Sequence, residues 1–188
     1  MKEIFKNKME KYPVIAAVKD LSNLEAALES KSEIIFLLSG NIFNLEDIVK
    51  KVKSRGKLIF IHVDLIDGFS KDATALKYIH EKIKPDGIIS TKNNQLKVAK
   101  ELGMLTVQRL FVIDSLSIDT TIKTSSVISP DAIEIMPGIM PKITKKLSSV
   151  LSVPIIMGGL ISEEEDVKKA TQSGALGVST SCSALWEL

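Results

Sequence analysis

The chain has 188 residues, of which 45% are hydrophobic and 26% charged, a composition that suits one globular domain with a sizeable core. Its formal net charge at pH 7 is only +2, which is less basic than a protein devoted to non-specific nucleic-acid binding usually is. The single cysteine excludes an intramolecular disulfide, and with two histidines it gives no set of metal ligands at a known spacing.

The N-terminal segment is charged and has no apolar stretch behind it, so we expect no secretory leader. No run approaches the 18 apolar residues that a membrane-spanning helix needs. With few cysteines as well, the sequence predicts a cytoplasmic protein without a membrane partner.

Eight short apolar runs, rich in β-branched residues, alternate with amphipathic stretches along the chain. Runs that are apolar on both faces are typical of parallel strands covered by helices. The predicted strands are residues 14–18, 34–38, 58–63, 87–90, 105–112, 132–136, 154–157 and 177–180.

The stretches between these runs repeat apolar residues at helical spacing. Three of them are followed by Gly56, Gly103 and Gly174, where a helix commonly ends on glycine. Ser162, with Glu165 three residues later, predicts a capping box at the start of the last long helix. The segment 114–129, rich in serine and threonine, is the weakest of the predicted helices.

Eight strands alternating with helices predict a single compact (β/α)8 barrel of the TIM type over residues 1–188. The competing α/β topology is an open doubly wound sheet. The count of eight strands and the lack of a glycine-rich loop after the first strand both count against it.

Two neighbouring strands near the end of the chain predict a phosphate site. One strand runs into Gly158 and Gly159, and the next runs into Ser179 and Thr180. Backbone N–H groups and hydroxyls at the seventh and eighth strand ends of a barrel often bind phosphate. The alternative is that the glycines only form a tight turn and the hydroxyls only cap a helix.

Charged residues at other predicted strand ends would line a pocket beside this phosphate site. In the barrel, function belongs to the carboxyl ends of the strands. Glu134 interrupts an apolar strand, so it faces the interior and needs a partner, for which Arg109 is the natural candidate. The predicted pocket residues are Asp20, Asp64, Lys92, Arg109 and Glu134.

Some orientations stay open at this stage. Asp64 and His62 share one face of their strand, with Asp64 toward the barrel mouth and His62 one layer lower. A lone buried histidine is more often a hydrogen-bonded core residue than a ligand contact, which is the interpretation we favour for His62. The alternation on its strand does not decide whether Gln108 or Arg109 points inward.

Lysines cluster at residues 50–57 and again at residues 142–146. A solvated helix face explains such clusters, although contacts to a nucleic-acid backbone would use the same residues. Only 5% of the chain is aromatic, so the sequence does not suggest a platform for stacking RNA bases.

Several stretches in a fixed order resemble the glycerol uptake operon antiterminator family, and the resemblance runs from Pro13 to Trp186. The stretches are Ile61-His62-Val63-Asp64 with Gly68, Lys84-Pro85-Asp86-Gly87, Gln108-Arg109-Leu110-Phe111, Ile133-Glu134-Ile135-Met136-Pro137-Gly138, Gly158-Gly159-Leu160-Ile161, and Val178-Ser179-Thr180-Ser181 with Leu185-Trp186.

The resemblance implies a regulator and not an enzyme. Family members are understood to sense glycerol 3-phosphate and to bind the leader of glycerol-operon messenger RNA, so that transcription passes a terminator. It therefore implies glycerol 3-phosphate as ligand and leader mRNA as partner. We expect no cofactor, and an apolar helix face could form a homodimer, although no stretch singles one out.

Two other functions fit the residues. A phosphate-binding barrel enzyme, an isomerase or aldolase for a small sugar phosphate, would use Asp64 and Glu134 as acid and base. A plain ligand-binding barrel would bind no RNA.

Overall fold

The computed structural model describes residues 1–188, apart from the side chain of Thr121. Eight parallel strands follow one another around a closed barrel. The predicted (β/α)8 barrel is confirmed and an open sheet is excluded, because β1 pairs with both β2 and β8. The strands are β1 (Val14–Val18), β2 (Ile34–Leu37), β3 (Leu58–His62), β4 (Gly87–Ser90), β5 (Leu105–Phe111), β6 (Ala132–Met136), β7 (Ile155–Gly158) and β8 (Gly177–Thr180).

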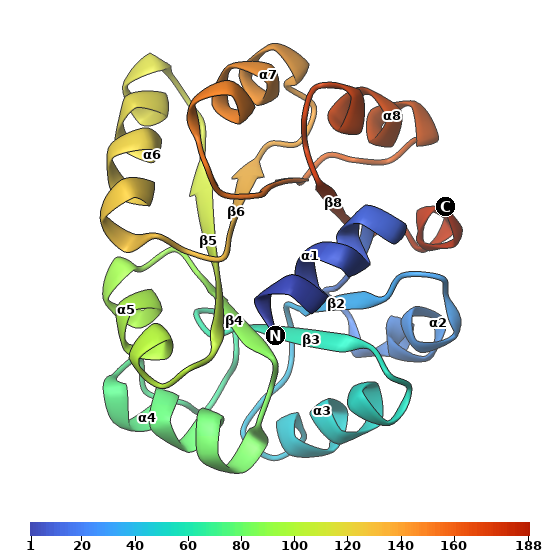
Figure 1. Cartoon of the computed structure of the whole chain (residues 1–188). Helices are drawn as coiled ribbons and strands as arrows, with labels where there is room; N and C mark the ends of the chain where they lie inside the picture. The colour runs from blue at the N-terminus through green and yellow to red at the C-terminus, as the bar shows by residue number, and fades with distance from the viewer.

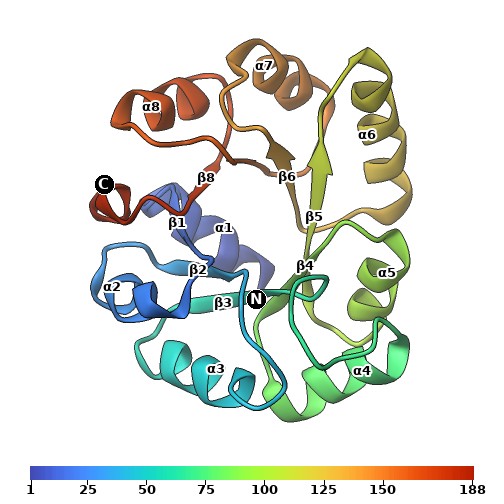
Figure 2. The ribbon, with the colours of Figure 1, turned by 180° about the vertical axis from the view of Figure 1, so that it is seen from behind.

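Each strand begins and ends within one residue of its prediction. Helices follow the strands and form a ring around the barrel (Figures 1 and 2). The helices of the ring are α2 (Leu24–Glu29), α3 (Leu45–Ser54), α4 (Ala73–Tyr78), α5 (Asn93–Glu101), α6 (Ser115–Ile128), α7 (Pro141–Val150) and α8 (Glu164–Gln172), with the short 3₁₀ turns η1 (Leu21–Asn23) and η3 (Ser183–Glu187) and the π-helical turn η2 (Ile79–Ile83).

Both faces of each strand are buried, one against the helices and the other in the barrel interior. On β3, Ile59 and Ile61 pack among the residues between barrel and helices, whereas Leu58 and Phe60 pack in the barrel interior. Alternate residues of a strand point to opposite faces, so this division also sets which polar residues face inward at the strand ends. Gly87 of β4 faces the interior, where a Cβ atom would lie only 2.5 Å from the ring of Phe60.

The N-terminal helix α1 (Lys2–Lys11) lies across the end of the barrel where the strands begin (Figure 1). Its Phe5 and Met9 are buried and join the interior cluster, with the Phe5 ring centroid 4.5 Å from that of Phe60. The sequence analysis did not predict this helix, because two apolar side chains among charged ones make no continuous helical stripe.

Helix ends follow the sequence in part. Gly56, Gly103 and Gly174 all have positive φ, as expected for glycine after a helix. The predicted start of α8 was wrong by one residue: the N-cap is Glu163, and its capping box is completed by Asp166. The predicted weakest helix, α6, extends over 14 residues because Asp114 and Ser117 form a capping box at its start.

If α1 closes the barrel, replacing Phe5→Ala should lower the free energy of unfolding by about 3–5 kcal/mol, since it leaves a cavity in the interior. Ile4 of the same helix is 50% exposed, so Ile4→Ala should change that free energy by no more than about 0.5 kcal/mol. Urea unfolding of the two variants measures the difference, and equal losses would contradict the closing role of α1.

Candidate functional site at the carboxyl ends of the strands

Figure 2 shows the barrel from the end opposite α1. This end contains a small cavity. Its volume is about 120 Å³, well above the ~10–15 Å³ that one water molecule needs. Strands β1, β2 and β5 to β8 supply its walls. Five residues predicted from sequence meet here: Arg109, Glu134, Gly159, Ser179 and Thr180.

A chain of hydrogen bonds crosses the cavity floor from β5 to β8. The Arg109 Nε donates to Glu134 Oε2 at 2.6 Å, and the Ser179 hydroxyl donates to Glu134 Oε1 at 2.5 Å. Glu134 is fully buried and Arg109 is 8% exposed. The predicted partnership of Arg109 and Glu134 is thus present, and Arg109 is the residue of its strand that points inward. Gln108 instead donates to Asn93 at the start of α5.

Gly158 lies directly beneath this chain. A Cβ atom there would come within 2.6 Å of Glu134 Oε1 and would collide with the Ser179 hydroxyl. The glycine therefore makes room for the bond between Glu134 and Ser179. It does not line the cavity itself, whereas its neighbour Gly159, with φ of +76°, does.

The Thr180 hydroxyl is bound to the protein. It donates to the carbonyl oxygen of Ile161 at 2.7 Å, while the Thr180 carbonyl accepts from Trp186 Nε1 at 2.8 Å. These bonds fix the turn after β7 and the segment after β8 against each other. A hydroxyl has one hydrogen to donate, so Ser179 and Thr180 offer an anion their backbone groups or must exchange a present bond. The neighbouring Ser181 also lines the cavity.

Asp64 ties the ends of β3 and β4 together. Its Oδ2 accepts from the Ser90 hydroxyl at 3.0 Å and from the Thr91 backbone N–H at 2.9 Å. Its other oxygen, Oδ1, is buried without a hydrogen-bond partner. Asp64 does not line the small cavity, but its open oxygen leaves it able to accept a further hydrogen bond.

His62 is buried one layer below Asp64, as predicted. Its Nδ1 lies 3.9 Å from Asp64 Oδ2 and has no hydrogen-bond partner, so the expectation of a hydrogen-bonded core histidine is wrong for this atom. Burial, and then the charge of Arg109, lower the pKa of His62 to about 4. The imidazole is therefore neutral at pH 7.

Besides Asp64, two more of the predicted pocket residues, Asp20 and Lys92, stand outside the cavity. Asp20 is exposed and accepts from the Ser22 N–H as the cap of η1, which lowers its pKa. Lys92 is exposed at the N-cap of α5. Lys19 lines the cavity instead, and the alternation of inward-facing Ile15 and Ala17 would have identified it.

The charges that line the cavity favour an anion. Two cations, Lys19 and Arg109, face one carboxylate, that of Glu134. Because Arg109 is already paired with Glu134, the charge of Lys19 is left over. Across the described part of the chain, Lys19 forms no ion pair, so a negatively charged ligand would be its counterion.

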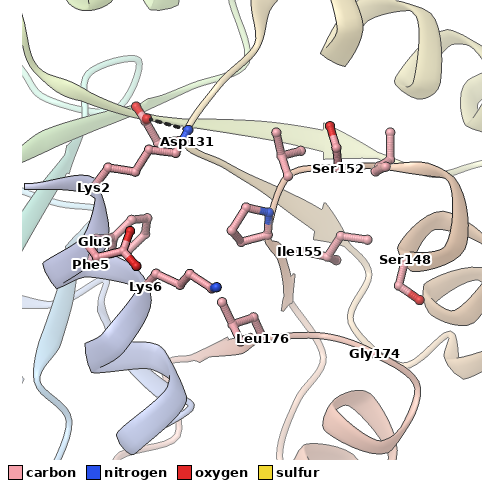
Figure 3. A pocket seen from close by; sticks show the side chains of 13 residues that line it. Lys2, Glu3, Phe5, Lys6, Asp131, Ser148, Ser152, Ile155, Gly174 and Leu176 are labelled. Carbon is pink, nitrogen blue, oxygen red and sulfur yellow. Dashed lines mark ion pairs between the residues drawn. The ribbon is translucent and has the colours of Figure 1, made fainter.

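A larger hollow of about 370 Å³ lies at the other end of the barrel, between α1 and the segments that precede β6 and β7 (Figure 3). Its two lysines pair with protein carboxylates: Lys2 lies 3.5 Å from Asp131 and Lys6 lies 3.5 Å from Glu10. None of the residues predicted for ligand binding lines it, and barrel proteins place their sites at the other end.

The described residues contain no group of three histidine, cysteine, aspartate or glutamate side chains that could hold a metal ion. They also form no helix with the length and apolar character needed to cross a membrane.

Fold and site together define a (β/α)8 barrel with a small cationic cavity at the carboxyl ends of its strands. The family model described as glycerol-3-phosphate responsive antiterminator matches residues 14–186. The chain belongs to this family, and the family resemblance of the sequence is confirmed.

Individual relatives agree with this assignment. The uncharacterized protein YgcP of Escherichia coli (strain K12) is 42% identical over 176 residues, 94% of this chain and 92% of that protein. A glycerol uptake operon antiterminator regulatory protein from Listeria monocytogenes strain 4b F2365 superposes with a TM-score of 0.89 at 36% identity, over 94% of this chain and 95% of that one. An antiterminator-related protein from Thermotoga maritima MSB8 gives 0.82 at 30% identity, over 93% and 98%.

Barrel enzymes, aldolases among them, match at only 11–15% identity. At that level the likeness shows the fold alone.

The neutral, buried His62 should make stability depend on pH. Because the unfolded chain takes up this proton below about pH 6.5 and the native barrel only below about pH 4, the free energy of unfolding should fall by roughly 3 kcal/mol as pH drops through that window. Urea unfolding at pH 7.5 and 4 measures the fall. In His62→Gln the decrease in the free energy of unfolding between these two pH values should be smaller by roughly 3 kcal/mol. His80→Gln, a change at the other histidine, should show the same decrease as the wild type. Equal decreases in the wild type and His62→Gln would contradict the burial of a neutral imidazole.

Proposed function

We propose that the protein senses glycerol 3-phosphate in the cavity at the carboxyl ends of its strands and controls glycerol genes by binding leader mRNA. The observation that carries the proposal is the leftover charge of Lys19 in a cavity walled by the ends of β7 and β8. Phosphate groups commonly bind at these two strand ends in barrels. Membership of an antiterminator family supports both the ligand and the RNA partner.

The phosphate would lie against Lys19, Gly159 and the ends of β7 and β8. Ser179 and Thr180 complete this phosphate side, through backbone groups or by exchanging hydroxyl bonds. Gly158 supports it from beneath the cavity, by leaving room for the bond between Glu134 and Ser179. The glycerol hydroxyls would meet Arg109 and Glu134. Asp64, whose unpaired Oδ1 is buried outside the cavity, would join them only if the loop after β3 moves. Asp20 and Lys92 stand farther out on the same end, so they would join the pocket only if the loops after β1 and β4 move toward the ligand.

The same contacts support a regulator over an enzyme. Glu134, the acid or base of the enzymatic alternative, is held by Arg109 on one oxygen and by Ser179 on the other. Asp64 is fixed by three hydrogen bonds from Ser90 and Thr91. Carboxylates bound in this way are fixed in position by the protein, as suits groups that orient a ligand. No further cofactor is part of the proposal.

The regulatory mechanism we propose is a linkage between two binding equilibria. Glycerol 3-phosphate can favour RNA binding only if it binds the RNA-competent state more tightly than the other state. The factor by which the ligand raises RNA affinity must then equal the factor by which RNA raises ligand affinity. Leader mRNA as partner implies that the protein acts in the cytoplasm. A homodimer stays a prediction.

Glycerol 3-phosphate at 100 times its Kd should stabilise the protein by about 2.7 kcal/mol, whereas glycerol should stabilise it much less.

Lys19→Gln should weaken glycerol 3-phosphate binding by roughly 10- to 100-fold, because it removes a charged hydrogen-bond donor to the phosphate. Lys146→Gln, which removes one positive charge from the exposed face of α7 and lies outside the cavity, is the matched control. Calorimetry and thermal unfolding measure both quantities.

Two outcomes would contradict the proposal. The cavity is not a phosphate site if neither glycerol 3-phosphate nor inorganic phosphate stabilises the wild type. The protein is an enzyme if it turns over a small sugar phosphate and Asp64→Asn abolishes that turnover.

A further inference from the structure

A groove of about 470 Å³ runs between α3 and the turn η2 on the outside of the barrel. These two elements lie side by side in the ring of helices (Figure 1). Four lysines line the groove, and Glu46 is the one acid that lines it with them, which leaves a net charge of +3. The lysines are Lys50 and Lys53 from α3, Lys82 from η2, and Lys84 just after η2.

Two of these lysines are engaged with the protein. Lys53 Nζ lies 3.2 Å from the buried carboxylate of Asp86 and donates to the carbonyl oxygen of Lys84 at 3.1 Å. Lys50 pairs with Glu46 at 2.6 Å. The ammonium groups of Lys82 and Lys84 form no ion pair or hydrogen bond with any described residue. The charge of Lys82 adds to that of Lys50 in lowering the pKa of Glu46, but Glu46 is already paired with Lys50. The groove therefore holds two cations without an ion pair of their own.

The rest of the lysine-rich run 50–57 points elsewhere. Lys51 pairs with Glu25 and Arg55 with Glu29, both across to α2. Lys57 donates to the backbone carbonyls of Ala27, Ser30 and Ser32, and its burial lowers its pKa. The lysine-rich run is therefore split between two surfaces. In the groove, Lys50 and Lys53 meet Lys82 and Lys84, which lie about 30 residues later in the sequence.

The favourable interaction of lysines with the C-terminal ends of helices does not by itself explain why four lysines line one groove. Lysines in the last turn of a helix interact favourably with its C-terminal carbonyl groups, which explains the charges of each helix taken alone. It gives no reason for two elements to direct their lysines into one groove, where like charges repel. A groove lined by one sign of charge focuses its potential and attracts a polyanion.

The rim of the opposite end of the barrel has more acidic groups. Carboxylates cap four of the helical elements that begin there, those of Asp20, Asp72, Asp114 and Glu163, whereas Lys92 is at the N-cap of α5. The helix α8 also opens with three acidic residues in its first turn. These rim carboxylates disfavour the approach of an RNA backbone more than the groove does, although the small cavity inside the rim is lined by Lys19 and Arg109.

We propose that the groove between α3 and η2 binds the phosphate backbone of RNA. The proposal rests on the proposed function for the RNA partner and adds the surface that holds it. Lys82 and Lys84 would contact phosphates directly, and Lys50 and Lys53 would contribute their charge from the facing helix. Such contacts position RNA without reading its sequence. The ligand and RNA would occupy separate sites and would not compete.

The test compares the double variant Lys82→Gln/Lys84→Gln with Lys145→Gln/Lys146→Gln. The control removes two exposed lysines from α7, so both variants lose the same charge. Each is titrated with a fluorescein-labelled leader transcript of a glycerol uptake operon, at several salt concentrations and with glycerol 3-phosphate present. The groove variant should bind roughly tenfold or more weakly, and its slope of log K against log salt should be smaller by ~1.4, about 0.7 for each lost contact to single-stranded RNA. The control should match the wild type.

Thermal stabilisation by glycerol 3-phosphate, measured on the same samples, separates the two proposals. Both variants should keep it, because the groove lies outside the ligand cavity. If the wild type binds the transcript and the groove variant binds it equally well, or the control loses as much, the groove is not the RNA surface while the proposed function stands. If the wild type binds no transcript, the RNA partner and the groove assignment both fail.

A lipid surface is the other polyanion to be tested. Vesicles of equal parts phosphatidylglycerol and phosphatidylcholine should bind neither the wild type nor the groove variant Lys82→Gln/Lys84→Gln appreciably. Binding of these vesicles that depends on Lys82 and Lys84, with RNA binding unchanged, would overturn the proposal.

Discussion

The ion pair between Arg109 and Glu134 determines how the mouth of this barrel is built. A carboxylate without solvent exposure is costly unless its charge is matched and both oxygens are hydrogen-bonded. Here Arg109 binds one oxygen and Ser179 the other, and Gly158 leaves the space that their meeting requires. The four residues come from the consecutive strands β5 to β8. One electrostatic requirement thus fixes a residue type on each of four neighbouring strands.

The pair also decides what the cavity above it can bind. Because Arg109 is neutralised by Glu134, it holds a fixed position and contributes little net charge to the mouth. Lys19, on the other side of the cavity, is the cation whose charge remains available. The cavity therefore combines a rigid polar floor with one movable positive group, which suits a small molecule that carries both hydroxyls and a phosphate.

Much of the fold could be predicted from sequence, because short apolar runs that alternate with amphipathic stretches leave few alternatives to a barrel. The partnership of Arg109 and Glu134 could also be predicted, because a charge inside an apolar strand needs a partner of opposite charge. The helix α1 was missed because its contribution depends on two side chains that reach a distant interior. The choice between Lys19 and Asp20 required knowing which face of β1 is inside. The lack of a partner for His62 Nδ1 follows from three-dimensional distances that no local pattern encodes.

The strands β3 and β4 connect the two ends of the molecule. At the ligand end, Asp64 ties them through Ser90 and Thr91. At the other end, the carboxylate of Asp86 accepts from the backbone N–H of Ile59 at 2.9 Å and also pairs with Lys53 in the groove. Asp64 lies beside the ligand cavity and does not line it, so a ligand would act on this strand pair only by moving the loop after β3. Since a ligand can shift an equilibrium only through contacts that differ between two states, a linkage between cavity and groove requires such a movement at β3 and β4.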